Sequence, residues 1–256
     1  MPDFKMDPWK YYDVTHRRHV LCNPTSLEKL DFVASLVGLK PGNRVVDIAC
    51  GKAELLARLA ERYGVSAVGV DKSPHVIEEA RKKLAERAPG AGVQLLLMDG
   101  ADFRPDLPES FALAICIGAS WVFGGHRGTL RALKGMAAPG GGLLVGEVFW
   151  QKEPDPEYLA FEGLSRDLCG SHLDNVRSGE QEGLVPLYAA VSNGDDWDRY
   201  EALQWRATAE WAAANPDDLD LTEVREKQAR SREAYLRWGR DTLGWALYLF
   251  QKPGKR

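Results

Sequence analysis

The sequence predicts an α/β fold in which a mostly parallel sheet is covered by helices on both faces. Up to about residue 150, five apolar runs rich in leucine or β-branched residues alternate with stretches of helical spacing. Strands that are apolar along their whole length are typical of parallel sheets buried on both sides. Three Pro/Gly turns, LKPGN, APGAG and APGGG, each precede one of these runs and indicate where a strand begins.

The elements follow in order along the chain. We expect strands at 44–49, 66–71, 93–99, 111–118 and 143–150, and helices at 26–38, 54–64, 73–87 and 128–137. The second half predicts a helix around 157–169, a strand at 184–192, helices at roughly 196–214 and 220–239, and a last strand at 243–251. Because the late strands can return to the same sheet, we expect a single domain, 1–256, with a helical elaboration late in the chain.

The composition is that of an ordinary globular chain. Of its 256 residues 45% are hydrophobic and 27% charged, and the net charge is −4. This charge argues against a nucleic-acid partner, which requires a basic surface. The N-terminus lacks the plan of a signal peptide, and the longest apolar run, 111–123, is too short to span a bilayer. We therefore expect a cytoplasmic protein with no membrane partner.

The cysteines give no sign of a metal site. Cys22, Cys50, Cys116 and Cys169 lie far apart and lack the CxxC spacing of zinc sites and redox pairs. A reduced compartment suits this pattern, and we expect no metal.

The stretch VVDIACGKAE (45–54) reads as a strand, a small-residue turn and the start of a helix, where α/β proteins bind nucleotides. In a dinucleotide loop the third glycine of GxGxxG would fall on Glu54, whose carboxylate would repel a pyrophosphate. A phosphate-binding loop needs Ser or Thr after Lys52, where Ala53 stands. The stretch therefore indicates a different ligand.

Three acids follow three successive strands. Asp47 ends the first strand, Asp71 the second and Asp99 the third, so all three are expected at one edge of the sheet. Asp47 can attract an ammonium or sulfonium, Asp71 can accept from ribose hydroxyls, and Asp99 from an adenine amino group. A helix cap, shared with Ser73, is the alternative for Asp71, and a plain turn residue for Asp99.

These residues carry a family resemblance. VVDIACGKAE, VGVDKS, LLLMDGADF and APGGGLLVGE resemble, in order, the motifs of class I S-adenosylmethionine (SAM)-dependent methyltransferases over roughly residues 40–150. The resemblance implies SAM as cofactor and a Rossmann-like seven-stranded sheet with an antiparallel last strand. HRRHVLCNPTS, GDDWDRYEALQW, AANPDD and LGWALYLF resemble a little-characterised bacterial subgroup with a helical insertion before that strand.

The resemblance divides the chain into an N-terminal helical cover (1–38), a SAM-binding core (39–150) and substrate-side helices with the last two strands (151–256). Ala49 and Ala53 stand where such loops often carry glycine, and we expect alanine to be accepted where the backbone does not need a positive φ. The predicted cofactor-binding residues are Asp47, Ala49, Cys50, Gly51, Asp71, Lys72, Asp99, Gly100, Ala101, Cys116 and Gly118.

Four residues are candidates for proton transfer. His16 and His19 lie in an N-terminal segment of the kind that commonly covers the active site in this fold, and histidine titrates near neutral pH. His126 follows the fourth strand. Glu147 interrupts an apolar run, where an unpaired carboxylate is costly. A surface position is the alternative for the histidines, and pairing with an arginine for Glu147.

Aromatic side chains are candidates for the acceptor pocket. Trp121 and Phe123 follow the fourth strand. Trp205 lies on a helix whose apolar stripe, which includes Tyr200, is typical of a core-facing side, and Trp205 points away from that stripe. Core packing is the alternative for Trp205. The predicted pocket residues are Tyr12, Trp121, Phe123, Trp150 and Trp205.

The function that these features predict is SN2 transfer of the methyl group of SAM to a small molecule, with O, N, S or C as the acceptor atom. Positioning of the acceptor would supply most of the catalysis. The alternatives are a methyltransferase acting on RNA or protein, and a SAM-binding regulatory protein without turnover.

Overall fold

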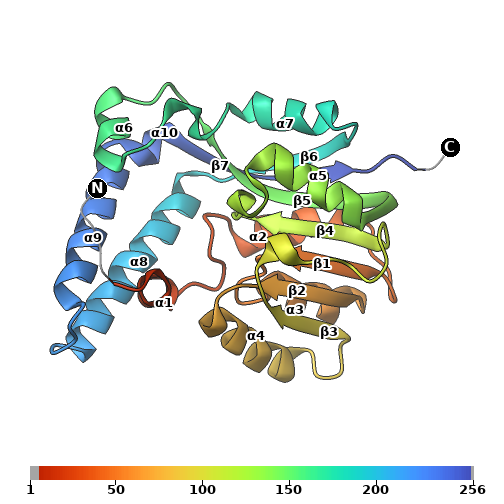
Figure 1. Cartoon of the computed structure of the whole chain (residues 1–256), viewed down its shortest axis with the longest axis horizontal. Coiled ribbons are helices and arrows are strands. Elements are labelled where there is room, and N and C mark those ends of the chain that lie inside the picture. Colours follow the sequence, from red (N-terminus) through yellow and green to blue (C-terminus); the bar gives the residue numbers. More distant parts are fainter. Residues whose placement is uncertain (1–5, 255–256) are drawn as a thin grey trace.

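A computed structural model describes residues 6–254, so the first five residues of the predicted cover lie outside the described residues (Figure 1). Seven strands form one sheet in the order β3-β2-β1-β4-β5-β7-β6. β7 runs antiparallel to both of its neighbours, as expected, and the pairs from β3 to β5 are parallel. The strands are β1 (Arg44–Ile48), β2 (Ser66–Asp71), β3 (Val93–Leu97), β4 (Phe111–Ile117), β5 (Ala137–Trp150), β6 (Val185–Val191) and β7 (Leu243–Gln251).

Helices surround the sheet. The longer ones are α1 (Pro8–His16), α2 (Leu27–Ser35), α3 (Glu54–Tyr63), α4 (Pro74–Arg87), α5 (His126–Met136), α6 (Pro156–Glu162), α7 (His172–Gln181), α8 (Gly194–Ala214) and α9 (Leu221–Ala234). Short helical turns are η1 (Gly100–Asp102), η2 (Ser120–Phe123), η3 (Arg166–Leu168), the π-turn η4 (Tyr235–Gly239) and α10 (Arg240–Thr242). Among the described helices, none has the length and apolar character needed to cross a membrane.

The continuously apolar strands serve two cores because alternate residues point to opposite faces. Val45 packs in a cluster with α2 and α3 on one face, while the next residue, Val46, packs in a cluster with α5 on the other. The late strands join the same arrangement, since Leu247 belongs to the first cluster and Tyr248 to the second.

The region after β5 differs from the expected single helix at 157–169. α6 ends at Gly163, which adopts a left-handed φ of 67°, and a residue without Cβ reaches this conformation at little cost. α7 was not expected. Ser171 and Asp174 form a reciprocal capping box at its start, a signal that is present in the sequence. β5 also begins six residues earlier than expected, at Ala137, which pairs with Phe111 of β4, whereas the pairing with β7 begins at Gly142.

The helical insertion between β6 and β7 places α8 and α9 beside α1, away from α4 and α5 (Figure 1). Val14 of α1 packs with Trp211 of α8 and Val224 of α9 in a small buried cluster. The N-terminal helix and the insertion, almost two hundred residues apart, therefore form one wall beside the sheet.

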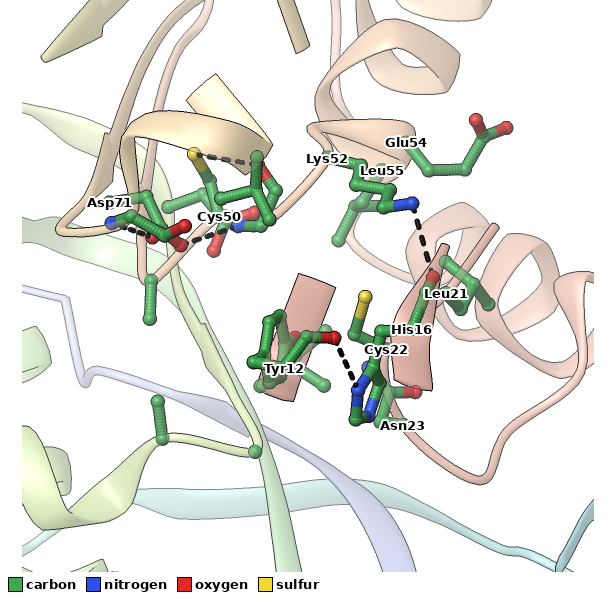
Figure 2. A pocket seen from close by; sticks show the side chains of 18 of the residues that line it. Tyr12, His16, Leu21, Cys22, Asn23, Cys50, Lys52, Glu54, Leu55 and Asp71 are labelled. Carbon is green, nitrogen blue, oxygen red and sulfur yellow. Dashed lines mark hydrogen bonds between the residues drawn. The ribbon is translucent and has the colours of Figure 1, made fainter. Parts of the chain in front are cut away.

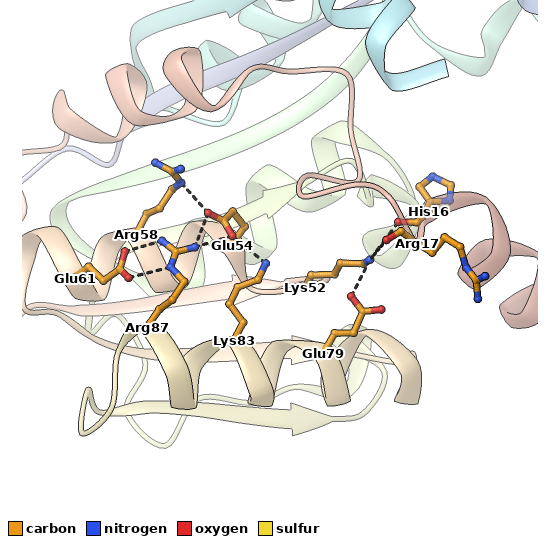
Figure 3. Close-up of polar contacts among 9 residues, drawn as sticks. All are labelled: His16, Arg17, Lys52, Glu54, Arg58, Glu61, Glu79, Lys83 and Arg87. Carbon is orange, nitrogen blue, oxygen red and sulfur yellow. Dashed lines mark hydrogen bonds and ion pairs between the residues drawn. The ribbon is translucent and has the colours of Figure 1, made fainter. Parts of the chain in front are cut away.

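Glu54, the first residue of α3, ties this helix to α4 (Figure 3). Its carboxylate is buried and accepts from Arg58 at 2.9 Å and from Arg87 at 2.8 Å, and it pairs with Lys83 at 2.9 Å. Burial alone would raise the pKa of Glu54, but the hydrogen bonds from Arg87 and Lys83 bring that pKa below its ordinary value. The carboxylate is thus a structural anion, neutralised by three cations.

Replacing Glu54 with Gln should lower the free energy of unfolding by about 2 kcal/mol, because three cations lose a buried, charged acceptor. The folded-state pKa is lowered, so this contribution is complete above the unfolded pKa of about 4.3 and disappears as the pH falls through the folded value. Urea denaturation at pH 7 and in acid measures both effects. Glu78→Gln, which removes an exposed pair with Lys82, is the matched control and should change little; equal losses for both variants would contradict the prediction.

Candidate active site

A cavity of about 730 Å³ lies where β1, β2 and β4 end, and α1 and α8 close its other side. Figure 2 shows Tyr12, His16 and Cys22 across the cavity from Cys50 and Asp71. The lining combines the segments after four parallel strands, β1 to β4, with side chains from the N-terminal helix and from the insertion. This is the edge at which open α/β sheets bind their ligands.

The loop after β1 has a left-handed backbone at alternate residues. The φ angles of Ala49, Gly51 and Ala53 are 59°, 52° and 53°. The condition under which we expected alanine to be accepted, a backbone without positive φ, is therefore not met at Ala49 or Ala53. The turn keeps this conformation through hydrogen bonds: the amide of Cys50 donates to Val70 at 3.0 Å, and the amide of Ala53 donates to Cys50 at 3.0 Å. Small side chains leave the backbone of the loop open to the cavity.

Asp47 lies in the cavity wall and is only 5% exposed. Burial, together with the nearby charge of Asp71, raises the pKa of Asp47 to about 8. A buried carboxylate without a cation is destabilised in its charged form. Asp47 therefore suits a ligand that brings a positive charge.

Asp71 joins the end of β2 to the loop. One carboxylate oxygen accepts from the amide of Gly51 at 2.9 Å and the other from the amide of Ser73 at 2.9 Å. Burial raises the pKa of Asp71. Each oxygen keeps a further lone pair, so the carboxylate can still accept from a ligand in the cavity.

Asp99 combines a turn role with a place in the cavity wall. It accepts from the amide of Ala101 at 3.0 Å as the cap of η1, and pairs with Lys72 at 2.8 Å. Lys72 lowers the pKa of Asp99 through this hydrogen bond. The turn role predicted as the alternative is thus present, and the carboxylate also lines the cavity.

Two glycines of the cavity lining pack closely against neighbouring side chains. A Cβ on Gly100 would lie 2.5 Å from Ile48, and one on Gly118 would lie 2.9 Å from the ring of Trp245. Ten of the eleven predicted cofactor-binding residues line the cavity. The other, Cys116, is buried in the core cluster that packs against α5.

The candidate proton-transfer residues separate into two places. His16 lines the cavity, and its Nε2 lies 2.9 Å from the hydroxyl of Tyr200. Burial and the neighbouring His19 lower the pKa of His16 to about 3. His19 lies behind it, with Nε2 2.8 Å from the carbonyl of Tyr200, and is not part of the cavity lining.

His126 and Glu147 lie together, apart from the cavity lining. Nδ1 of His126 is 3.7 Å from the Glu147 carboxylate, and Nε2 is 3.0 Å from the carbonyl of Asn175. Burial lowers the pKa of His126 and raises that of Glu147, which favours the neutral form of both groups. The arginine predicted as the alternative partner of Glu147 is replaced by this histidine.

Among the predicted pocket residues, Tyr12 and Trp121 line the cavity, whereas Phe123, Trp150 and Trp205 pack in neighbouring clusters. The sequence interpretation missed Trp197, Tyr200 and Trp245, all of which line it. Tyr200 was assigned to a core stripe of its helix. Periodicity identifies the buried face of a helix but does not distinguish a core from a cavity wall.

The fold and the cavity define a Rossmann-like protein that binds a nucleotide-type cofactor beside a second ligand. Residues 45–141 match the family model described as a methyltransferase domain. A SAM-dependent methyltransferase from Thiobacillus denitrificans, solved with S-adenosyl-L-homocysteine, is 30% identical, has a TM-score of 0.88, and is matched over 96% of this chain and 99% of that one. A SAM-dependent methyltransferase from Geobacter sulfurreducens, also solved with S-adenosyl-L-homocysteine, is 28% identical and has a TM-score of 0.88. It is matched over 94% of this chain and 97% of that one.

The chain belongs to the SAM-dependent methyltransferases, and SAM is its cofactor. It is also 29% identical to the uncharacterized protein YjhP of Escherichia coli over 95% of this chain and 98% of that protein. Similarity to the cyclopropane-fatty-acyl-phospholipid synthase of Escherichia coli, 39% identical, is restricted to 35% of this chain and 22% of that protein.

The strained loop gives a stability prediction. Ala49→Gly should raise the free energy of unfolding by about 0.5 kcal/mol, because the cost of a left-handed alanine, about 1–2 kcal/mol, exceeds the entropic cost of glycine, about 0.5–1 kcal/mol. At Ala53, which is fully buried, loss of the methyl group costs about 0.8 kcal/mol more, so Ala53→Gly should be close to neutral.

Thermal or urea unfolding measures both variants. Ala209→Gly, at an exposed position in the interior of α8, is the control and should lose about 1 kcal/mol. A loss of the same size for Ala49→Gly would contradict the left-handed conformation.

Proposed function

We propose that this protein transfers the methyl group of SAM to a small molecule that enters the 730 Å³ cavity. The proposal rests on one observation. Acids at the ends of β1, β2 and β3 line the same cavity as aromatic side chains from α1, α8 and β7. The volume is within the range of pockets that bury small ligands. In this proposal residues 1–256 act as one methyltransferase domain.

The residues present fit the cofactor. In our proposal Asp47 faces its ammonium or sulfonium charge, Asp71 accepts from the ribose hydroxyls, and Asp99 accepts from the adenine amino group. Gly100 and Gly118 let their loops pack closely against the sheet side of the site, because a Cβ at Gly100 would collide with Ile48 and one at Gly118 with Trp245. When bound, SAM supplies an electrophilic methyl group on a sulfonium.

The protein contributes position and the exclusion of water. Tyr12, Tyr200 and Trp245 surround the space left for the acceptor, and holding two reactants in line contributes much of the rate in reactions of this kind. His16 is the proton-transfer candidate that can reach the acceptor directly. Its lowered pKa makes it a hydrogen-bond partner that stays neutral and accepts protons weakly.

The setting we propose is the cytoplasm, with neither nucleic acid nor membrane as partner. The four cysteines are free thiols, as a reducing compartment would keep them. The net charge of −4 offers no general attraction for nucleic acid.

Asp71→Ala should weaken binding of S-adenosylhomocysteine about 30- to 100-fold, because hydrogen bonds to a charged carboxylate contribute about 1.5–3 kcal/mol and the Gly51 amide also loses its acceptor. Isothermal titration calorimetry measures the affinity, and circular dichroism verifies the fold. Asp102→Ala, an exposed acid in η1, is the control and should bind normally. Unchanged affinity in the Asp71 variant would refute the proposed cofactor site.

Cofactor binding should release protons near neutral pH. With a pKa of about 8, Asp47 is mostly protonated at pH 7, and a bound ammonium favours its charged form. Affinity for S-adenosylhomocysteine should therefore rise with pH and level off above about pH 8, relative to Asp47→Asn.

Calorimetry in buffers of different ionisation enthalpy counts the released protons. The Asp47→Asn variant retains the titration of the ligand's own amino group, so the difference between the two proteins isolates Asp47. Equal proton release by both would contradict a charged contact at this position.

A further inference from the structure

The charges around the cavity favour a cation over an anion. Both lysines of the lining are already paired, Lys52 with Glu79 at 2.8 Å and Lys72 with Asp99 at 2.8 Å. Among the described residues that line the cavity there is no arginine. Asp47 and Asp71 have no ion pair with any described residue. A carboxylate or phosphate acceptor would therefore find no free positive partner.

The acceptor side of the cavity is walled by aromatic rings from three elements. Tyr12 of α1 stacks on His16 with ring centroids 4.1 Å apart, Trp197 and Tyr200 of α8 meet edge to face at 6.5 Å, and Trp245 comes from β7. The π-faces of aromatic rings attract cations, and cages of such rings recognise alkylammonium groups.

Glu201 is a further acid, on the far side of this aromatic wall. Glu201 follows Trp197 by one helical turn, with Trp205 one turn further on the same face of α8. Both indole rings lie against Tyr235, at 6.3 and 6.4 Å. Glu201 forms no ion pair with any described residue, and burial beside Glu162 raises the pKa of Glu201 to about 7. Its field adds to that of the cavity acids when it is ionised.

Among the described residues that line the acceptor side, none is suited to strong base catalysis. The imidazole of His16 has a pKa lowered to about 3. Burial raises the pKa of both Tyr12 and Tyr200, so their hydroxyls stay protonated. An alcohol acceptor would have to lose its proton during the reaction, whereas an amine that is uncharged at neutral pH attacks with a lone pair that it already has.

We propose that the methyl acceptor is an amine carried on an apolar or aromatic body, and that the aromatic wall from α1, α8 and β7 holds its nitrogen. This inference rests on the proposed methyl transfer and deepens it. The uncharged amine attacks the methyl carbon through its nitrogen lone pair as the sulfur–methyl bond breaks. The electron pair of that bond stays on sulfur, and the positive charge passes to nitrogen.

A tertiary amine then gives a quaternary ammonium with no proton to remove, and a primary or secondary amine gives a protonated product that releases its proton to water. In both cases a cation develops on the nitrogen during the transfer. The aromatic wall stabilises that charge more than it stabilises the neutral amine, which is what methyl transfer to nitrogen requires.

The binding of product-like probes tests the amine inference without any need for turnover. With S-adenosylhomocysteine saturating the protein, benzyltrimethylammonium should bind at least about tenfold more tightly than neopentylbenzene, its uncharged isostere, and phenylacetate should bind more weakly than either. Calorimetry measures the three affinities. Equal or tighter binding of the uncharged or the anionic probe, or no binding of the cation at millimolar concentration, would overturn the amine assignment.

A matched pair of variants tests the wall itself. Tyr12→Leu removes a ring and should reduce the preference for the cation over its isostere about tenfold, whereas Tyr12→Phe keeps the ring and should keep the preference. Equal preferences in both variants would exclude Tyr12 from the nitrogen site. Failure of wild-type protein to bind S-adenosylhomocysteine would contradict the proposed function itself, and normal cofactor binding with a preference for phenylacetate would contradict the amine inference alone.

Discussion

The position of the cavity depends on one buried ammonium group. Lys52, in the loop after β1, donates to the carbonyl of His16 at 3.1 Å, approaches that of Arg17, and pairs with Glu79 of α4 (Figure 3). Its side chain is 6% exposed, and a buried ammonium without these partners would cost several kcal/mol. The end of α1 is thereby held against the loop that faces the cofactor.

This contact explains how distant parts of the chain become one site. α1 packs on α8 through Val14 and Trp211, so the lysine that holds α1 also sets the distance between the cofactor loop and the insertion. Tyr12, His16 and Tyr200 then face the loop across the cavity. Alignment of donor and acceptor, which methyl transfer needs more than acid–base chemistry, thus follows from packing around one charge.

Much of the fold and the cofactor half of the site could be predicted from the sequence. Strand-terminal acids such as Asp47 and Asp71 are visible because parallel strands end at the same edge. The left-handed backbone at Ala49 could not be inferred, since alanine rarely adopts it and only the packed loop imposes it. Tyr200 and Trp245 looked like core, because burial patterns do not reveal which buried rings enclose a cavity. His126 and Glu147 were both predicted to transfer protons at the active site, whereas the fold brings them together outside the cavity lining.

The two thiols in the cavity wall could themselves accept the methyl group. Cys22 and Cys50 line a cavity whose cofactor is an alkylating agent, and a thiolate there would compete with any acceptor for the methyl group. Burial raises the pKa of both thiols. They therefore stay protonated and poorly nucleophilic at neutral pH. At the proposed site, burial of the two thiols thus disfavours methylation of the enzyme's own side chains.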